Sequence, residues 1–331
     1  DIVPNHVAVG GADNAWWLDV LEWGRDSIYA SFFDIDWDAA DPALTDRVLA
    51  PFLDKPYGEA LVAGDVSLCL DAESGRLHFV VHETHRFPLA PELYGRLLRG
   101  TQNEVLAEMG RGFRDAVSRR RPRAARRAAF ESMCVKLAQA TQESPVRQTL
   151  DDLITHYAAQ AEGAATRLHR LLERQHYRLA WWRTAADEIN WRRFFDVTDL
   201  AGIRIQDNAA FEAMHATTFR LYADGLIDGL RVDHVDGLAD PRAYCRKLRK
   251  RLDALGARRP AHLPRERAYF VVEKILAPGE RLARDWRVDG TSGYVFMNEV
   301  SAVLHDPSGR EPLVRLWREF SGRSANFDAE E

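Results

Sequence analysis

The chain has 331 residues, of which 46% are hydrophobic and 29% charged, and its formal net charge is -5. These values describe a globular protein with a large core, in one big domain or two ordinary ones. A slightly acidic chain has no electrostatic reason to bind nucleic acid or an anionic membrane, so neither is expected as a partner. The basic run at 119–127 is a local exception, interpreted as a solvated face rather than a binding patch.

Cysteine usage bears on the compartment. Cys69, Cys134 and Cys245 lie far apart and form no paired metal or redox motif, which is typical of a reducing cytoplasm. No apolar run approaches the roughly 20 residues that span a bilayer, and no signal peptide opens the chain. We therefore expect a cytoplasmic protein without cofactor or metal. Because residue 1 is Asp1 and not Met, the sequence is interpreted as a piece of a longer protein.

The first forty residues contain one interpretable element. Residues 1–6 are interpreted as the end of a buried strand that Pro4 closes, with Asn5 and His6 projecting from its carboxyl end. Residues 10–37 are rich in glycine, aspartate and aromatic side chains, and this composition looks too irregular for a regular element.

A mixed block follows the opening strand. Two β-like runs, 66–70 and 77–81, flank the turn signal Glu73-Ser-Gly75 and predict a hairpin. From 91 to roughly 174, apolar residues recur at three- and four-residue steps, as in helices with one apolar face. Residues 10–200 are therefore predicted to form an insertion or subdomain.

The stretch 177–196 alternates aromatic side chains with Arg, Asp, Glu and Asn. Flat aromatic faces and planar polar groups that make paired hydrogen bonds are what a sugar ring requires. A core helix with its polar residues facing water is the alternative, and we favour a carbohydrate surface. The candidate sugar-binding residues here are Trp181, Trp182, Arg183, Glu188 and Trp191.

Helices and strands alternate regularly from residue 201 onwards. A helix capped by Asp207 or Asn208 precedes a strand at 230–233, and a helix capped at Asp240 precedes a strand at 269–273. Strands this short and continuously apolar are typical of a parallel sheet covered by helices. Right-handed crossovers then place the carboxylates that end both strands at the same sheet edge.

Those two carboxylates are Asp233 and Glu273, and Arg231 shares a strand face with Asp233. Paired carboxyl groups suit glycosidic-bond chemistry, in which one attacks the anomeric carbon and the other protonates the leaving oxygen. We expect Arg231 to keep Asp233 ionised as the nucleophile. Apolar surroundings should raise the pKa of Glu273, which would then act as the acid.

Three of these segments together resemble the α-amylase superfamily of glycoside hydrolases. Residues 1–6 look like its first sequence region, Gly229-x-Arg231-x-Asp233 its second, and Glu273 its third. A more specific likeness, to the maltooligosyltrehalose synthase family, runs along almost the whole chain. It is carried by residues 57–60, 85–88, 176–190, 193–196 and 272–280.

The resemblance implies an α/β fold, namely a partial (β/α)8 TIM barrel with a large, mostly helical inserted subdomain. Residues 1–9 would be the end of a barrel strand, 10–200 the inserted subdomain and 201–331 continuing barrel units, with both barrel flanks missing.

The activity implied is an intramolecular transglucosylation, an isomerase-type step of trehalose biosynthesis. It converts the reducing-end α-1,4 linkage of a maltooligosaccharide into an α,α-1,1 linkage, and a maltooligosyltrehalose trehalohydrolase would be the functionally paired enzyme. By the resemblance, Asp233 forms the glucosyl-enzyme intermediate and Glu273 serves as acid and then base. The substrate-binding residues implied at this centre are Asn5, His6, Arg231 and His234.

The chain departs from the family pattern in ways that keep alternatives open. No stretch offers the third carboxylate of the superfamily, which is expected beyond Glu331, and Val295 stands where an acidic residue is expected. The chain alone is therefore expected to be inactive. The alternatives are a hydrolase or another transglycosylase of the same superfamily, and a non-catalytic glucan-binding fragment.

Overall fold

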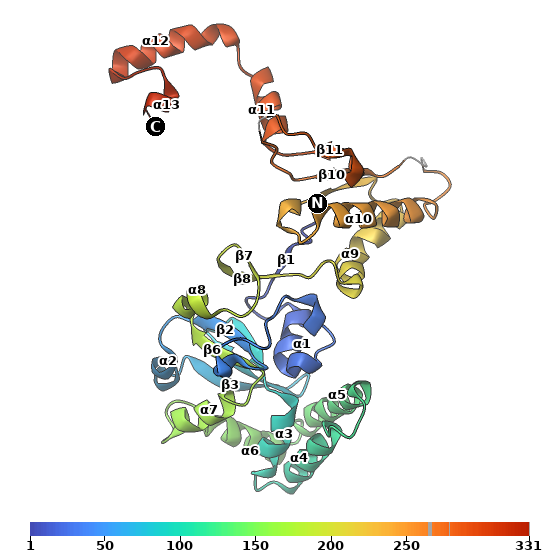
Figure 1. Ribbon diagram of the computed structural model, residues 1–331. Helices are drawn as coiled ribbons and strands as arrows, with labels where there is room; N and C mark the ends of the chain where they lie inside the picture. The colour runs from blue at the N-terminus through green and yellow to red at the C-terminus, as the bar shows by residue number, and fades with distance from the viewer. Residues whose placement is uncertain (264–266, 278, 331) are drawn as a thin grey trace. The chain divides into compact units, whose positions relative to one another are not determined.

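The computed structural model describes residues 1–263, 267–277 and 279–330, so Pro278 of the family-like segment 272–280 lies outside the described residues. The chain divides into two compact units (Figure 1). Unit 1 comprises Asp1–Pro4 and Met214–Glu331, and unit 2 comprises Asn5–Ala213. The predicted domain limits at residues 9 and 200 stay a prediction.

Unit 2 contains three small sheets. The predicted hairpin is confirmed, because β3 (Val66–Asp71) and β4 (Arg76–Val81) pair antiparallel and β5 (His85–Pro88) extends the sheet. Gly75 closes the turn with φ 69°, a conformation that suits glycine. A parallel pair joins β2 (Val48–Leu53) to β6 (Tyr177–Trp181). The third sheet has the order β1 (His6–Ala8), β8 (Val197–Gly202) and β7 (Arg193–Phe194).

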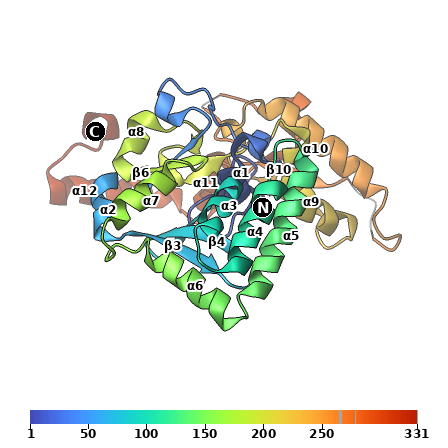
Figure 2. The same cartoon turned by 90° about the horizontal axis from the view of Figure 1, so that it is seen from below.

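Helices make up most of the rest of unit 2, as the sequence predicts for 91–174. Helices α3, α4 and α5 pack together, and Figure 2 shows α4 and α5 side by side. The helices of this unit are α1 (Ala15–Trp23), α2 (Tyr57–Ala63), α3 (Pro91–Arg99), α4 (Glu104–Ala116), α5 (Arg123–Ala140), α6 (Ser144–Thr155), α7 (Ala164–Leu172) and α8 (Ala185–Glu188).

The interpretation of 10–37 as wholly irregular is wrong, because α1 is a regular helix. The Asn14 side chain caps it by accepting hydrogen bonds from the backbone N–H groups of Trp16 and Trp17 at 3.1 Å. Trp17 and Leu21, four residues apart, both lie in the core. Glycine- and aspartate-rich flanks masked this short apolar face in the sequence.

The first six residues do not form the single strand end that the sequence suggests. Ile2 makes an isolated parallel bridge with Val232 in unit 1. After Pro4 the chain enters unit 2, where His6 begins β1 and lies opposite Gly202 in antiparallel pairing. The position of Asn5 and His6 at the carboxyl end of the strand segment that contains Ile2 stays a prediction.

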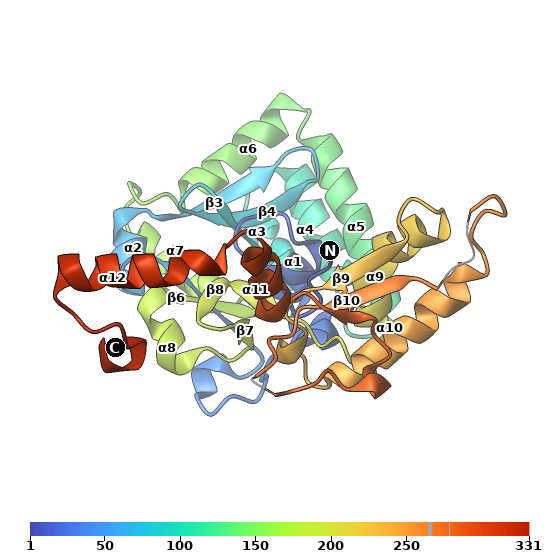
Figure 3. The same cartoon turned by 90° about the horizontal axis from the view of Figure 1, so that it is seen from above.

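Unit 1 is built on a parallel sheet, as predicted. Its order is β9 (Gly229–Val232), β10 (Tyr269–Val272) and β11 (Gly290–Thr291), and both pairings are parallel. Figure 3 shows α10 alongside these strands. The remaining helices of the chain are α9 (Asn208–Ala223), which starts in unit 2, α10 (Pro241–Gly256), α11 (Tyr294–Val303), α12 (Arg310–Ser321) and α13 (Phe327–Glu330).

The α/β class is therefore confirmed, whereas no sheet of the described residues closes into a barrel. The predicted caps are present: Asp207 accepts hydrogen bonds from the N–H groups of Ala209 and Ala210, and Asp240 accepts one from Ala243. Across the described part of the chain, no helix combines the length and apolar character needed to cross a membrane.

Helix α10 is fixed to the sheet by a buried arginine as well as by its apolar face. Arg249 is 0% exposed and donates to the carbonyl oxygens of Ala268 at 2.6 Å and Arg287 at 2.9 Å. It also pairs with the Asp289 carboxylate at 2.8 Å. These contacts hold the chain on either side of β10, the strand that leads to Glu273.

We expect Arg249→Met to lower the free energy of unfolding of unit 1 by about 3 kcal/mol, because Asp289 and two carbonyl oxygens lose their donor. Urea unfolding measures the change. Arg246→Met on the exposed face of α10 is the control and should change stability by less than about 0.5 kcal/mol. Equal effects of the two substitutions would contradict this role of Arg249.

Candidate active site

Asp233 and Glu273 leave the sheet at neighbouring positions. In the parallel pairing of β9 with β10, Val232 lies opposite Val272, so the residues that follow emerge at the same edge. The backbone N–H of Glu273 donates to the carbonyl oxygen of Val232 at 2.8 Å. The predicted juxtaposition of these two carboxyl groups is confirmed within unit 1.

One guanidinium group links the acidic side chains. Arg231 donates from Nη1 to Asp233 Oδ1 at 3.2 Å, and its Nη2 lies 3.2 Å from Glu273 Oε2. Nη1 also reaches both carboxylate oxygens of Asp1, at 2.7 and 2.9 Å. Nε donates to Ser292 Oγ at 2.8 Å. Every nitrogen of the guanidinium is therefore engaged, which fixes its plane between the two carboxyl groups.

His234 contributes its backbone to the same cluster. Its φ of 47° lies in the left-handed region, which a non-glycine residue seldom adopts. This conformation directs the His234 N–H to Glu273 Oε2 at 3.1 Å. Backbone strain at a polar cluster is typical of functional sites, where surrounding structure maintains it.

The protonation expected for the pair is wrong in direction. Burial, together with a hydrogen bond to Glu273, raises the pKa of the Asp233 carboxyl above its ordinary value. The hydrogen bond with Asp233 and the one from the His234 N–H lower the pKa of Glu273. Of the two carboxyl groups, Asp233 is therefore the one with the higher pKa relative to its ordinary value. Two facts explain this: Arg231 is divided among three carboxyl groups, and the Glu273 side chain is 37% exposed.

Sequence reasoning missed Ser292, which directly follows β11. The backbone N–H of Ser292 donates to the carbonyl oxygen of Val272 at 3.0 Å, which brings its hydroxyl to Arg231. A short polar residue directly after a strand was the available signal. Val295, expected to be acidic in relatives, lies on α11 and is 44% exposed.

The structure brings together Arg231, Asp233 and Glu273, with His234 beside them, in unit 1. It places Asn5 and His6 side by side in unit 2, where His6 Nδ1 lies 3.4 Å from Asn5 Oδ1. The His6 ring packs on Phe194, with ring centroids 4.0 Å apart.

The aromatic block of unit 2 is not a core helix, because residues 177–181 form β6. The Arg183 guanidinium lies 4.8 Å from the ring centroid of Trp181 and 5.3 Å from that of Trp182. Trp181 is fixed by a hydrogen bond from Nε1 to the Asp54 carbonyl oxygen at 3.1 Å. Trp182 is 54% exposed, so this group presents an aromatic surface to solvent.

The other two candidates of that block lie beside a cavity. Glu188 and Trp191 are among the residues lining a volume of about 420 Å³ in unit 2. Trp191 itself is only 4% exposed, donates from its indole N–H to the Leu49 carbonyl oxygen at 2.8 Å and packs edge-on against Trp17. Its principal contacts are therefore those of a core residue.

Comparison with known proteins gives this geometry a context. No family model matches the chain. It is 34% identical over 317 residues to a protein named "Putative maltooligosyl trehalose synthase" from Mycobacterium tuberculosis, covering 96% of this chain and 28% of that protein. The chain is related over nearly its whole length to the maltooligosyltrehalose synthases.

Solved structures agree with this relationship. A maltooligosyltrehalose synthase from Arthrobacter ramosus matches 99% of this chain with a TM-score of 0.57 and 30% identity, and 31% of its own chain is covered. A glycosyltrehalose synthase of strain DSM5389 gives a TM-score of 0.58 and 27% identity, with 33% of that chain covered. The chain thus spans about a third of the length of these maltooligosyltrehalose synthases, and the matched part includes both units.

We expect Glu273→Gln to lower the pKa of Asp233, because the substitution removes the neighbouring negative charge that stabilises the protonated Asp233 carboxyl. In the unsubstituted chain, folding raises the pKa of Asp233. The contribution of this group to the free energy of unfolding is therefore full below the ordinary aspartate pKa, and it is lost as the pH rises to the raised pKa. In the variant that window moves to lower pH. A carboxyl-carbon NMR titration of labelled aspartate measures the midpoint.

Glu280→Gln is the matched control, because Glu280 pairs with Lys274 at 3.0 Å and does not belong to the Arg231 cluster. Its Asp233 midpoint should equal that of the unsubstituted chain. An unchanged or higher midpoint in Glu273→Gln would show that the carboxyl pair does not share a proton.

Proposed function

We propose that a protein containing this chain catalyses intramolecular transglucosylation, converting the reducing-end α-1,4 linkage of a maltooligosaccharide into an α,α-1,1 linkage. The observation that carries the proposal is the pair Asp233 and Glu273, held on one guanidinium at adjacent parallel strand ends. The relationship to maltooligosyltrehalose synthases supports the choice of reaction, with 34% identity across 96% of the chain.

The reaction would proceed by double displacement with retention. Asp233 attacks the anomeric carbon of the penultimate glucosyl unit, the bond from that carbon to O4 of the terminal glucose breaks, and Glu273 gives a proton to the departing O4. The released glucose then turns over. Its anomeric hydroxyl attacks the same carbon, the ester bond to Asp233 breaks, and Glu273 takes back a proton.

The geometry adds two requirements to this scheme. The two carboxyl groups are hydrogen-bonded to each other, so they must separate before an anomeric carbon can enter between them. Asp233 must also be ionised to act as the nucleophile, so the raised pKa of its carboxyl works against the first step unless the proton is held by Glu273. Arg231 supports this change, because its separate Nη groups remain paired with each carboxylate as the two move apart.

Other features of the proposal depend on parts beyond this chain. The sheet of unit 1 would be part of a (β/α)8 barrel, and the third carboxylate would come from the portion of the relatives that this chain does not match. Asn5, His6 and His234 would bind the sugar, and a trehalohydrolase would consume the product. Water must be excluded while the glucose turns over, since its attack would give hydrolysis.

Incubation with maltopentaose tests the reaction in a protein that carries this chain at the full length of its relatives. We expect reducing ends to disappear, because the new linkage joins two anomeric carbons. Asp233→Asn should lower the rate at least about 1,000-fold, because the nucleophile is lost. A rise in reducing ends would identify a hydrolase of the same superfamily and overturn the proposal. The 331-residue chain alone is expected to show no turnover.

A second candidate function for the chain by itself is glucan binding without turnover. The exposed group of Trp181, Trp182 and Arg183 favours it, because one indole is anchored by a hydrogen bond and the guanidinium covers both rings. A preorganised aromatic surface of this kind can stack on the apolar face of a glucosyl ring.

We expect Trp182→Ala to weaken the binding of maltoheptaose to the 331-residue chain about fivefold, through loss of one stacking surface. Isothermal titration calorimetry measures the dissociation constant. Phe320→Ala is the control, since Phe320 is an exposed aromatic residue on α12, outside this group. Equal affinities of Trp182→Ala and the unsubstituted chain would exclude Trp182 from glucan binding.

A further inference from the structure

A cavity of about 410 Å³ in unit 2 lies next to the basic run of the sequence. Its cationic lining comes from three segments of the chain: the turn after α1, the stretch from the end of α4 into α5, and the residue before β6. The lining residues are Trp23, Arg25, Asp26, Asp46, Arg119, Arg126 and His176.

The carboxylates of this cavity are already paired. Asp26 accepts a hydrogen bond from Arg126 Nη2 at 2.8 Å. Asp46 forms an ion pair with Arg25, whose guanidinium also pairs with Asp38 outside the lining. Both carboxylates of the lining therefore already have an arginine partner.

Hydrogen-bond donors are in surplus at the same cavity. Arg126 is only 8% exposed, and its buried Nε has no hydrogen-bond partner among the described atoms. Nε2 of His176 is also buried, but it faces a carboxylate of its own, with Glu92 Oε2 3.6 Å away. The Arg119 side chain is exposed at the same cavity. Leaving a buried donor unpaired is unfavourable, so Arg126 Nε requires an acceptor.

The position of His176 is fixed by the backbone beneath it. A Cβ atom on Gly24 would lie 2.8 Å from His176 Nδ1, so only glycine allows the ring to sit at this place. Gly24 also has φ 57°, which suits glycine. The imidazole is therefore held against the backbone at the end of α1.

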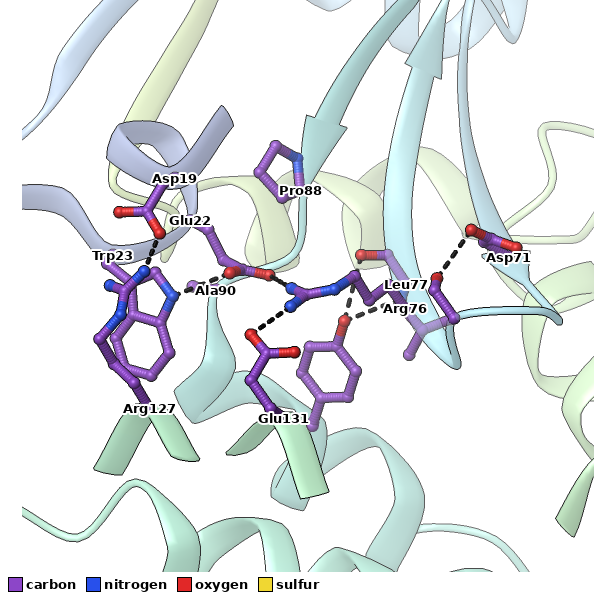
Figure 4. Close-up of polar contacts among 12 residues, drawn as sticks. Asp19, Glu22, Trp23, Asp71, Arg76, Leu77, Pro88, Ala90, Arg127 and Glu131 are labelled. Atoms are coloured by element: carbon purple, nitrogen blue, oxygen red, sulfur yellow. Dashed lines mark hydrogen bonds and ion pairs between the residues drawn. The ribbon is translucent and has the colours of Figure 1, made fainter. Parts of the chain in front are cut away.

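A neighbouring polar network of this unit pairs its arginines with carboxylates. In Figure 4, Arg76 lies between the carboxylates of Glu22 and Glu131, and Arg127 reaches Asp19. A cavity of about 310 Å³ borders this network, but its central arginine is paired with both acids. Arg127 Nη1 in this network is also buried without a partner, but Arg127 does not line the 310 Å³ cavity, whereas Arg126 lines the cavity beside it.

We propose that the cavity beside Arg126 binds a phosphate group. A ligand that pairs with these donors must itself supply hydrogen-bond acceptors. The oxygens of a phosphate group are acceptors, and their spacing matches the paired N–H groups of a guanidinium. The guanidinium groups of Arg126 and Arg119, which both line the cavity, would be its donors. The cavity is larger than a phosphate ion, so a phosphate monoester such as a sugar phosphate fits as well as free phosphate.

This proposal also accounts for the basic run 119–127, which the sequence suggested was a solvated face. That interpretation is wrong for its last two residues, because Arg126 is buried and Arg127 pairs with Asp19. Arg119 and Arg120 remain exposed. Their positive charge would attract an anion to the cavity mouth.

Calorimetric titration of the 331-residue chain tests the proposal, with inorganic phosphate in one arm and glucose 6-phosphate in the other, at concentrations up to about 10 mM. We expect saturable binding in at least one arm. Arg119→Gln should weaken it about tenfold, through loss of one charge-assisted hydrogen bond at an exposed position that does not threaten folding. Tighter binding of glucose 6-phosphate would identify a phosphate monoester as ligand, and equal affinities would identify free phosphate.

The matched control is Arg120→Gln, which removes the same charge one residue away from a side chain that does not line the cavity. It should weaken binding less than about twofold. Absence of saturable binding in both arms would overturn the proposal. Equal losses in the two variants would also overturn it, because they would reduce the effect to general charge attraction.

Discussion

The guanidinium of Arg231 is the interaction on which the candidate active site depends. It stands at the end of β9 and is paired with Asp1, Asp233 and Glu273, while Ser292 holds its Nε. Two acidic groups brought this close would repel each other if both were ionised. One fixed cation and one shared proton remove that repulsion, and the parallel register of β9 with β10 supplies the positions.

This arrangement also limits what the cluster can do by itself. With one cation divided among three carboxyl groups, burial and the hydrogen bond to Glu273 raise the pKa of Asp233, the residue that the proposed mechanism needs in its ionised form. Further groups must therefore act on the pair during the reaction. The chain spans only 28% of the length of the Mycobacterium tuberculosis relative, so such groups would come from the part that this chain does not match. Substrate contacts and the third carboxylate are natural contributions from the remainder.

Unit 2 uses charge differently. Between α1, β4 and α5, arginines and carboxylates pair with one another in a network that ties the helices to the hairpin (Figure 4). Arg126, the residue before Arg127 on α5, lines a cavity, and its buried Nε has no hydrogen-bond partner among the described atoms. The same residue type is thus structural at one position and available to a ligand at the next, and only its partners distinguish the two.

The sequence by itself determined the elements whose signals are local. Alternating helix and strand patterns predicted the parallel sheet of unit 1, and a turn signal predicted the hairpin at 66–81. The position of Asp233 and Glu273 at one sheet edge followed from the same alternation, because parallel strands end together.

Tertiary structure decided what depends on partners distant in the chain. The protonation of Asp233 and Glu273 could not be inferred from strand neighbours, because Asp1 and Ser292 share the same arginine from far away in sequence. Likewise, nothing local distinguishes Arg126, which is buried beside a cavity, from the exposed Arg120. Periodicity records which face of an element is apolar, whereas charge pairing and burial depend on which other elements fold against that face.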